Sequence, residues 1–386
     1  MIVSLDPGEI KRRAVAAARS LGAGDVRVTA AFEDGESRER MRAAFDRGDF
    51  ATWRYDEAYA RRAADPQQLL ANARSVICIA VPYATAAPQP RALRGRVSNY
   101  AWSPDYHRRM RALLREVARG IDEAAGGAVT AIACDTKPLA ERAFAARAGL
   151  GWIGKHTNLI SPELGSFVFL GEIVTTLELP ADAVLRKSCG ACVRCVDACP
   201  TGALRGDYTI DATLCISDLT QRTDAIPRAM RPLIGDWIWG CDLCQTSCPP
   251  TQNAGNRGGG LDVPLDEEAA APSLTALLRL RSGEFKRRFE KTAMGWRGAA
   301  ILRRNAAVAL GNALDRSAVG ALALALDEDP HAMVRGHAAW ALGRIASPSA
   351  LSALRARYEA EADGGVREEI RAALEPFPSS TPLGAV

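Results

Sequence analysis

Eight of the ten cysteines in this 386-residue chain lie within residues 181–255, and their spacing is suited to metal chemistry. The first four follow the pattern C-x2-C-x2-C-x3-C-P and are Cys189, Cys192, Cys195 and Cys199. Bacterial ferredoxins hold [4Fe–4S] clusters with this pattern. Zinc is the alternative, but zinc sites usually pair their C-x2-C units across a longer spacer. The spacing therefore favours an iron–sulfur cluster.

A second, modified cysteine pattern completes a two-cluster module. It keeps the ending C-x2-C-x3-C-P, and Cys215 stands in for its missing first cysteine. In two-cluster ferredoxins the last cysteine of each run binds the cluster of the other run. This crossing assigns one cluster to Cys189, Cys192, Cys195 and Cys248. It assigns the other cluster to Cys199, Cys215, Cys241 and Cys244.

The cysteine module is preceded by a region that a simple electron carrier does not need. Within residues 1–180, strand patterns at 75–81 and 129–134 alternate with an amphipathic helix at 105–125 and a helix near 138–149. Strands that alternate with helices predict an α/β domain. We therefore expect something other than the clusters to bind in front of the cysteine module.

The C-terminal region repeats itself. The segments LRRNAAVAL (302–310), VRGHAAWAL (334–342) and VREEIRAAL (366–374) recur with a period of 32 residues. Alanine and leucine recur at helical spacing in each copy, which predicts HEAT-like helical repeats. An ordinary helical domain with chance similarity is the alternative. Residues 251–272, rich in glycine, proline and acidic residues, are predicted to be a linker.

Composition limits the class of protein. Hydrophobic residues make up 48% and charged residues 24%, which excludes a mostly disordered chain. No apolar stretch is long enough for a membrane span, and the N-terminus lacks the pattern of a secretory signal. We therefore expect a soluble cytoplasmic protein.

Residues 85–119 and 281–304 each carry a local charge of +6, which could attract RNA or could simply be solvated.

Longer segments resemble the epoxyqueuosine reductases of the tRNA-modification pathway. They are CDTKPLAERAFAARAGLGWIGKHTNLISPELGSFVFLGE (134–172), CISDLT (215–220), IPRAMRPLIGDWIWGCDLCQ (226–245) and LRRNAAVALGN (302–312). Together with both cysteine runs they cover nearly the whole chain. Their joint occurrence in this order is far more specific than the ferredoxin spacing.

The resemblance implies a cobalamin-dependent reductase with two [4Fe–4S] clusters. Such enzymes convert the epoxide of epoxyqueuosine, at the wobble position of tRNA, into queuosine. The implied fold is a multidomain α+β protein. Residues 1–180 would form a cobalamin-binding α/β domain like that of reductive dehalogenases, residues 181–255 a ferredoxin-like module, and residues 273–378 HEAT-like repeats that help hold tRNA. We expect a monomer that takes electrons from an external low-potential donor.

The resemblance also implies a catalytic acid. An alkoxide is a poor leaving group, so the departing oxygen needs a proton donor. In the family this is an aspartate at a D-T/S-x-P turn, which matches Asp135. The alternative is that Asp135 caps the helix near 138–149.

Asp105-Tyr-His107 begins like the D-x-H-x-x-G motif that supplies a histidine to cobalt, but Met110 replaces its glycine. A histidine-ligated cofactor is therefore not indicated.

The resemblance extends to binding residues. It implies cofactor contacts by His156, Ser217, Asp242 and Gln245. It also implies contacts to tRNA phosphates by residues that begin the first repeat, namely Arg303, Arg304 and Asn305. For His156 the alternative is a solvated histidine in a loop, and for the three residues that begin the first repeat it is a solvated helix end.

Some positions depart from the family pattern. Lys137 stands where a small residue is usual, and Asp218 replaces an aromatic residue. These departures leave two other functions open. One is a cobalamin and iron–sulfur reductase with a different substrate, and the other is a non-catalytic electron-transfer adaptor whose repeats dock a protein.

Overall fold

The computed structural model describes residues 6–51, 55–127, 129–255 and 267–375. The chain forms two compact units, each assembled from separate segments. Unit 1 comprises residues 1–86, 105–215 and 242–264, and unit 2 comprises residues 87–104, 216–241 and 265–386. The predicted regions 1–180, 181–255 and 273–378 divide the chain differently and stay predictions. Most of the predicted linker at 251–272 lies outside the described residues.

Unit 1 is built on a four-stranded sheet with the order β1-β2-β7-β4. The strands are β1 (Asp25–Ala30), β2 (Ser75–Pro82), β7 (Val168–Thr175) and β4 (Thr130–Ala133). All neighbouring strands in this sheet are antiparallel. Every residue of β2 is buried, which explains its continuous apolar sequence SVICIAVP. The strands predicted at 75–81 and 129–134 are thus confirmed to within two residues.

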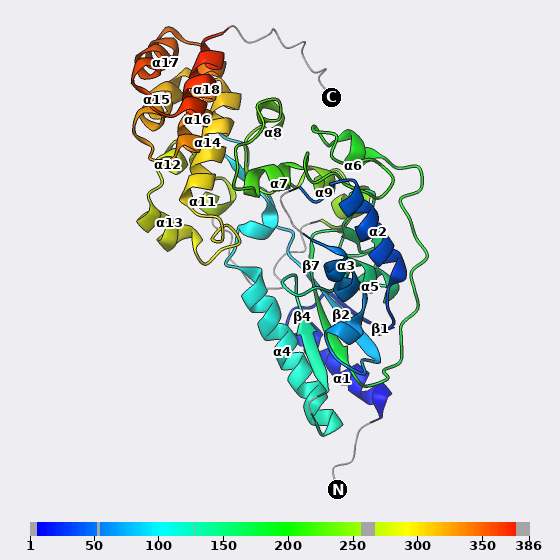
Figure 1. Ribbon diagram of the computed structural model, residues 1–386. Coiled ribbons are helices and arrows are strands. Elements are labelled where there is room, and N and C mark those ends of the chain that lie inside the picture. The colour runs from blue at the N-terminus through cyan, green and yellow to red at the C-terminus, as the bar shows by residue number, and fades with distance from the viewer. Residues whose placement is uncertain (1–5, 52–54, 128, 256–266, 376–386) are drawn as a thin grey trace. The chain divides into compact units, whose positions relative to one another are not determined.

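Helices cover both faces of this sheet (Figure 1). Helix α4 (Tyr106–Ala125) packs with α1 (Pro7–Ser20) and against β4 and β7. Gly171 of β7 permits the close approach of α4, because a Cβ there would lie 2.8 Å from Met110. Helix α5 (Glu141–Arg147) contacts β1, β2 and β7 and shares a core with Cys78 and Val174. Successive residues of β7 therefore face different helices.

The remaining elements of unit 1 are short and surround the cysteines and the sheet. They are α2 (Gly35–Asp46), α3 (Glu57–Ala64), β5 (Trp152–Ile153), β6 (Leu159–Ile160), α6 (Arg194–Asp197), α9 (Leu243–Thr246) and α10 (Pro249–Ala254). Helix α6 packs against α9 and thereby brings the two cysteine runs together. The mixed helix and sheet composition predicted for this chain is confirmed.

Unit 2 contains the helical repeats, coloured yellow to red in Figure 1. Its main helices are α12 (Leu274–Leu278), α13 (Ser282–Phe289), α14 (Ala299–Ala313), α15 (Val319–Glu328), α16 (Ala332–Ile345), α17 (Pro348–Ala360) and α18 (Gly364–Leu374). Its other elements are β3 (Arg96–Val97), α7 (Ile216–Gln221), α8 (Arg231–Ile234), β8 (Trp237–Trp239) and α11 (Glu267–Ala270). None of the helices described in either unit is both long and apolar enough to cross a membrane.

The three copies of the 32-residue repeat lie on α14, α16 and α18. Each of these helices packs against the next, while α15 and α17 form the second helix of each pair. Close packing depends on small residues, since a Cβ at Gly311 of α14 would lie 2.7 Å from the Trp340 ring on α16. The predicted helical repeat architecture is confirmed.

Candidate functional site

Asp135 lies directly beyond the end of β4 in unit 1. Its backbone adopts a left-handed conformation with φ of 52°, which aspartate tolerates better than most residues. Its backbone N–H donates to the Glu141 carboxylate at the start of α5. The Asp135 side chain is 61% exposed. The alternative that it caps the following helix is wrong, because α5 begins at Glu141 and its N-cap residue is Ala140.

A histidine joins two aspartates at this point. The Nδ1 atom of His107 lies 2.5 Å from Asp105 Oδ1, and its Nε2 atom lies 2.9 Å from Asp135 Oδ2. Asp105 also caps α4 by accepting a hydrogen bond from the His107 backbone N–H. The cap fixes His107 in the first turn of α4, so that its ring reaches Asp135, 28 positions further along the chain.

The two aspartates change the acidity of the histidine. Burial of the ring disfavours the cation, but the hydrogen bonds to Asp135 and Asp105 outweigh it, so the pKa of His107 is raised. His107 can therefore carry a proton near neutral pH and share it with Asp135 along the Nε2–Oδ2 contact. Asp105 orients the ring for this exchange. The sequence analysis missed this three-residue chain, although Asp105-Tyr-His107 at a helix start was visible.

Two glutamates interact close to Asp135, Glu172 on β7 and Glu141 at the start of α5. Glu172 lies on β7 opposite Cys78 and Ala133 and is 0% exposed. Its carboxyl group interacts with that of Glu141 through a side-chain hydrogen bond and through charge repulsion. Burial raises the pKa of Glu141 to about 7, and burial together with Glu141 raises the pKa of Glu172 well above its ordinary value. Glu172 therefore keeps its proton to a higher pH than an ordinary glutamate does.

The raised pKa of Glu172 predicts that the stability of the protein depends on pH. The folded-state pKa of Glu172 lies above its ordinary value of 4.5, so the unfolded chain releases this proton first as pH rises, and stability falls. Each unit between the two pKa values corresponds to about 1.4 kcal/mol. In thermal unfolding, Glu172→Gln is expected to match the parent protein at pH 4 and to be more stable at pH 8. Glu163→Gln, an exposed control, should leave the curve unchanged. Parallel curves for Glu172→Gln and the parent would contradict the prediction.

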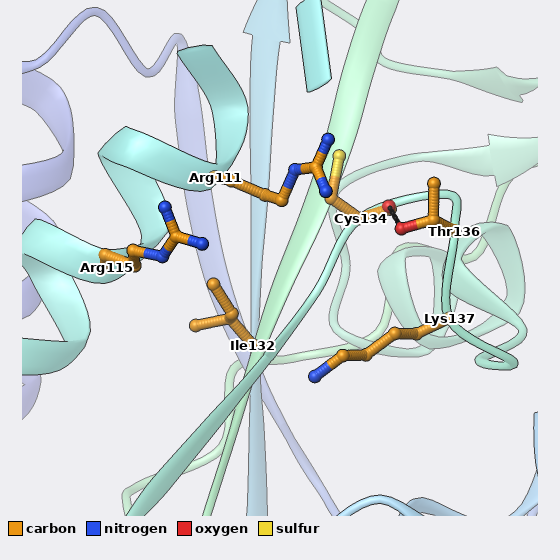
Figure 2. A pocket seen from close by; sticks show the side chains of 6 residues that line it. All are labelled: Arg111, Arg115, Ile132, Cys134, Thr136 and Lys137. Carbon is orange, nitrogen blue, oxygen red and sulfur yellow. Dashed lines mark hydrogen bonds between the residues drawn. The ribbon is translucent and has the colours of Figure 1, made fainter. Parts of the chain in front are cut away.

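A basic cavity of about 270 Å³ adjoins the Asp135 loop. Figure 2 shows that side chains from α4, β4 and the loop line it. The lining residues are Arg111, Arg115, Ile132, Cys134, Thr136 and Lys137. The sequence analysis noted Lys137 only as a departure from the family pattern, and Arg111 and Arg115 only as part of a basic window.

Four cysteines of unit 1, which the crossing rule assigns to one cluster, interact electrostatically. Burial, with the nearby thiols of Cys189, Cys248 and Cys192, raises the pKa of Cys195 to about 11. Cys248 likewise interacts with Cys189 and Cys192. Thiols that oppose each other's ionisation are ones that a metal centre would stabilise as thiolates. The chemistry of these four thiols suits an iron–sulfur cluster, and their assignment to a single cluster stays a prediction.

The other four cysteines are distributed between the units. Cys199 follows α6, Cys215 precedes α7, and Cys244 lies within α9. These three belong to unit 1, while Cys241 belongs to unit 2. All four are partly exposed. Their assignment to a second cluster stays a prediction.

The predicted cofactor contacts lie in different environments. His156 in unit 1 is 2% exposed, and burial lowers its pKa to about 4, so its ring is neutral. Its Nε2 atom has no hydrogen-bond partner among the described residues. Asp242 and Gln245, also in unit 1, are buried and lie 3.4 Å apart, Oδ1 to Nε2. Ser217 in unit 2 accepts a hydrogen bond from Gln221.

The three predicted tRNA contacts require correction. Arg303, Arg304 and Asn305 are buried within α14 of unit 2. Arg303 pairs with Asp329, with Nε 2.6 Å from Oδ2. Arg304 donates to the backbone carbonyls of Leu219, Arg222 and Asp224, and Asn305 donates to those of Thr220 and Ile238. Buried donors that already have acceptors cannot reach a phosphate. Arg304 and Asn305 instead anchor the first repeat to the segment 216–241, while Arg303 ties it to Asp329 and to the carbonyl of Leu280.

This role predicts a large loss of stability for Arg304→Met. The substitution would leave two buried carbonyls and one partly buried carbonyl without this donor, which we expect to lower the free energy of unfolding by about 3–5 kcal/mol. Arg355→Met, which changes an exposed arginine of α17, should shift it by less than about 0.5 kcal/mol. Denaturant unfolding of both variants measures the difference. Equal stability of the two would contradict the structural role.

Comparison with known families matches three parts of the chain. Residues 63–136 match the epoxyqueuosine reductase QueG family, and residues 188–251 match the 4Fe-4S double cluster binding domain. Residues 298–375 match the HEAT repeats. The predicted two-cluster module and the predicted repeats are therefore both confirmed at the level of family.

Individual relatives cover almost the whole chain. The epoxyqueuosine reductase of Bacillus cereus is 33% identical over 380 residues, covering 96% of this chain and 98% of the relative. A crystal structure of epoxyqueuosine reductase with an epoxyqueuosine-modified tRNA-Tyr stem loop is 32% identical, with a TM-score of 0.89 over 96% of this chain and 99% of that chain. The Bacillus subtilis enzyme, in a structure with its catalytic aspartate loop swung out of the active site, is 31% identical, with a TM-score of 0.89 over 97% of this chain and 100% of that chain. This chain therefore belongs to the epoxyqueuosine reductase family.

Proposed function

We propose that this protein reduces the epoxide of epoxyqueuosine in tRNA to the cyclopentene of queuosine. The observation that carries the proposal is the exposed Asp135 carboxyl, hydrogen-bonded to His107, in a chain that also has a two-cluster module. The solved relative bound to an epoxyqueuosine-modified stem loop supports tRNA as the substrate.

The reaction requires two electrons and two protons, and the epoxide oxygen leaves as water. Asp135 protonates the oxygen as its bond to carbon breaks, because protonation turns a poor leaving group into a good one. His107 then returns a proton to Asp135 across the 2.9 Å contact, and Asp105 holds the ring in place. The chain thus supplies a renewable proton at one atom, Asp135 Oδ2.

The proposed cofactors are cobalamin, in a dehalogenase-like N-terminal domain, and two [4Fe–4S] clusters. When bound they supply electrons of low potential to the epoxide carbon. Asp105 and Asp135 contact both ring nitrogens of His107, which leaves neither nitrogen available as a metal ligand. The site would therefore suit a corrinoid that is not ligated by this histidine. We retain His156, Ser217, Asp242 and Gln245 as proposed cofactor contacts. An external electron donor and a monomeric state also remain part of the proposal.

His107→Gln tests the proton supply. Glutamine can still accept or donate one hydrogen bond but cannot take up a proton, so Asp135 would be reprotonated only from solvent. We expect kcat to fall by about 10–100-fold, within the range of positioned proton transfer, and KM for tRNA to stay within about twofold. The parent enzyme should lose activity as pH rises through the His107 pKa, which lies above its ordinary value of 6.5, and this step should be missing from the kcat profile of the variant. An unchanged pH profile would contradict the relay.

The function is tested by incubating the protein, reconstituted with iron, sulfide and cobalamin, with epoxyqueuosine tRNA and a low-potential reductant. Nucleoside analysis should show conversion to queuosine. Unchanged nucleoside, despite intact cluster and corrinoid spectra, would refute the proposal.

Lys137 beside Asp135 motivates the second candidate, a reductase for a different substrate. Turnover of a free nucleoside without tRNA would favour it.

A further inference from the structure

Three basic side chains converge on the cavity beside Asp135. Arg111 and Arg115 are four residues apart on α4 and therefore lie on one face of that helix, in line with His107. Lys137 reaches the cavity from the loop that carries Asp135, and Figure 2 shows all three with Thr136 around the same space. Each step of four residues along a helix is about 6 Å. The cavity thus begins about one helical turn from His107.

These three cations lack acidic partners. Within the described part of the chain, none of them forms an ion pair, and the Nε of Arg111 donates to the His107 carbonyl, which leaves its terminal nitrogens for the cavity. Other arginines of the same basic window are paired, for example Arg119 with Glu116 and Glu123. The basic charge of the window is therefore left uncompensated at the cavity.

We propose that this cavity binds a phosphodiester group of the RNA strand whose modified nucleoside reaches Asp135. This inference rests on the proposed function. Guanidinium groups match the geometry of phosphate oxygens, Lys137 adds a point charge, and Thr136 adds a hydroxyl group at the rim. A cavity of about 270 Å³ has room for a phosphate group. Positioning one phosphate beside Asp135 fixes the register of the strand at the reacting nucleotide.

The nucleotide tail of cobalamin also contains a phosphodiester, so the two sources share one chemistry. The structure favours the RNA, because Arg115, Thr136 and Lys137 are exposed at the surface of unit 1, where a macromolecule has access. The experiment separates the two sources by measuring RNA binding and corrinoid retention independently.

The test uses Arg115→Gln, Lys137→Gln and the double variant in the reconstituted full chain. The control is Arg108→Gln, which removes an exposed arginine of α4 that does not line the cavity. The Kd of an anticodon stem loop is measured by fluorescence anisotropy across a range of salt concentrations. Phosphate contacts carry no base information, so an unmodified stem loop serves as well as a modified one. Circular dichroism confirms that each variant is folded.

We expect the double variant to bind the stem loop about 10-fold or more weakly. The slope of log Kd against log salt should fall by about one for a lost phosphate contact. Arg108→Gln should keep the parent slope. A parent slope in the folded double variant would overturn the inference, and so would loss of corrinoid with unchanged RNA affinity, which would assign the phosphate to the cofactor. Because stem-loop binding needs no turnover, this result is independent of whether the parent protein reduces the epoxide.

Discussion

Replacing Asp135 by asparagine is expected to lower kcat by about 10²–10⁴-fold, the range that positioned general acids contribute. Asparagine keeps the shape of the side chain but has no acidic proton for the departing oxygen. It also breaks the proton exchange with His107 Nε2, which lies 2.9 Å from the Asp135 carboxyl. Iron content, the corrinoid spectrum and the Kd for tRNA should be those of the parent, since Asp135 is not assigned to any of these sites. Single-turnover conversion of epoxyqueuosine tRNA measures the effect.

Glu163→Gln makes the same change from acid to amide at an exposed position of unit 1 and should leave kcat unaltered. Activity of Asp135→Asn within twofold of the parent would exclude Asp135 as the acid. Loss of activity together with loss of tRNA binding would assign it to substrate binding instead.

The second large effect is expected for Cys248→Ser. Cys248 lies after α9, yet its thiol interacts with Cys189 and Cys192, which precede α6. Serine is a poor ligand for iron, so this variant should lose the cluster that the first cysteine run holds. Iron per chain is expected to fall from about eight to about four, as two [4Fe–4S] clusters require. Turnover should fall to background because the electron path is interrupted.

The crossed assignment is checked with Cys215→Ser, which should remove the other cluster. Low-temperature EPR of the two single variants is expected to show different remaining signals, and the double variant should show none. Identical remaining signals would place Cys248 and Cys215 on one cluster and overturn the crossing. Full iron content in either single variant would remove that cysteine from the ligand set.

Local patterns were enough to predict the parts of this protein that depend on residues close in sequence. The cysteine runs predict clusters because three ligands within seven residues can surround one cubane. The repeats at 302–310, 334–342 and 366–374 predict stacked helices, and α14, α16 and α18 bear this out. The buried strand β2 is evident from its apolar run, since both of its faces are covered.

Contacts between distant residues could not be predicted in the same way. His107 and Asp135 are 28 positions apart and meet only because α4 packs against β4, the strand that precedes Asp135. In the sequence Glu172 only interrupts an apolar strand. Its buried position next to Glu141, which raises its pKa, follows from the packing of α5 on the sheet. An arginine side chain fits a phosphate or a set of buried carbonyls equally well in sequence terms. Arg304 binds backbone carbonyls because α14 packs on residues 219–238. Arg115 instead faces solvent, because it lines the open cavity beside α4. Sequence periodicity and spacing thus determined the helical repeats and the two-cluster module. Burial and proximity, which exist only in the folded chain, determined the contact between His107 and Asp135 and the charge of the neighbouring cavity.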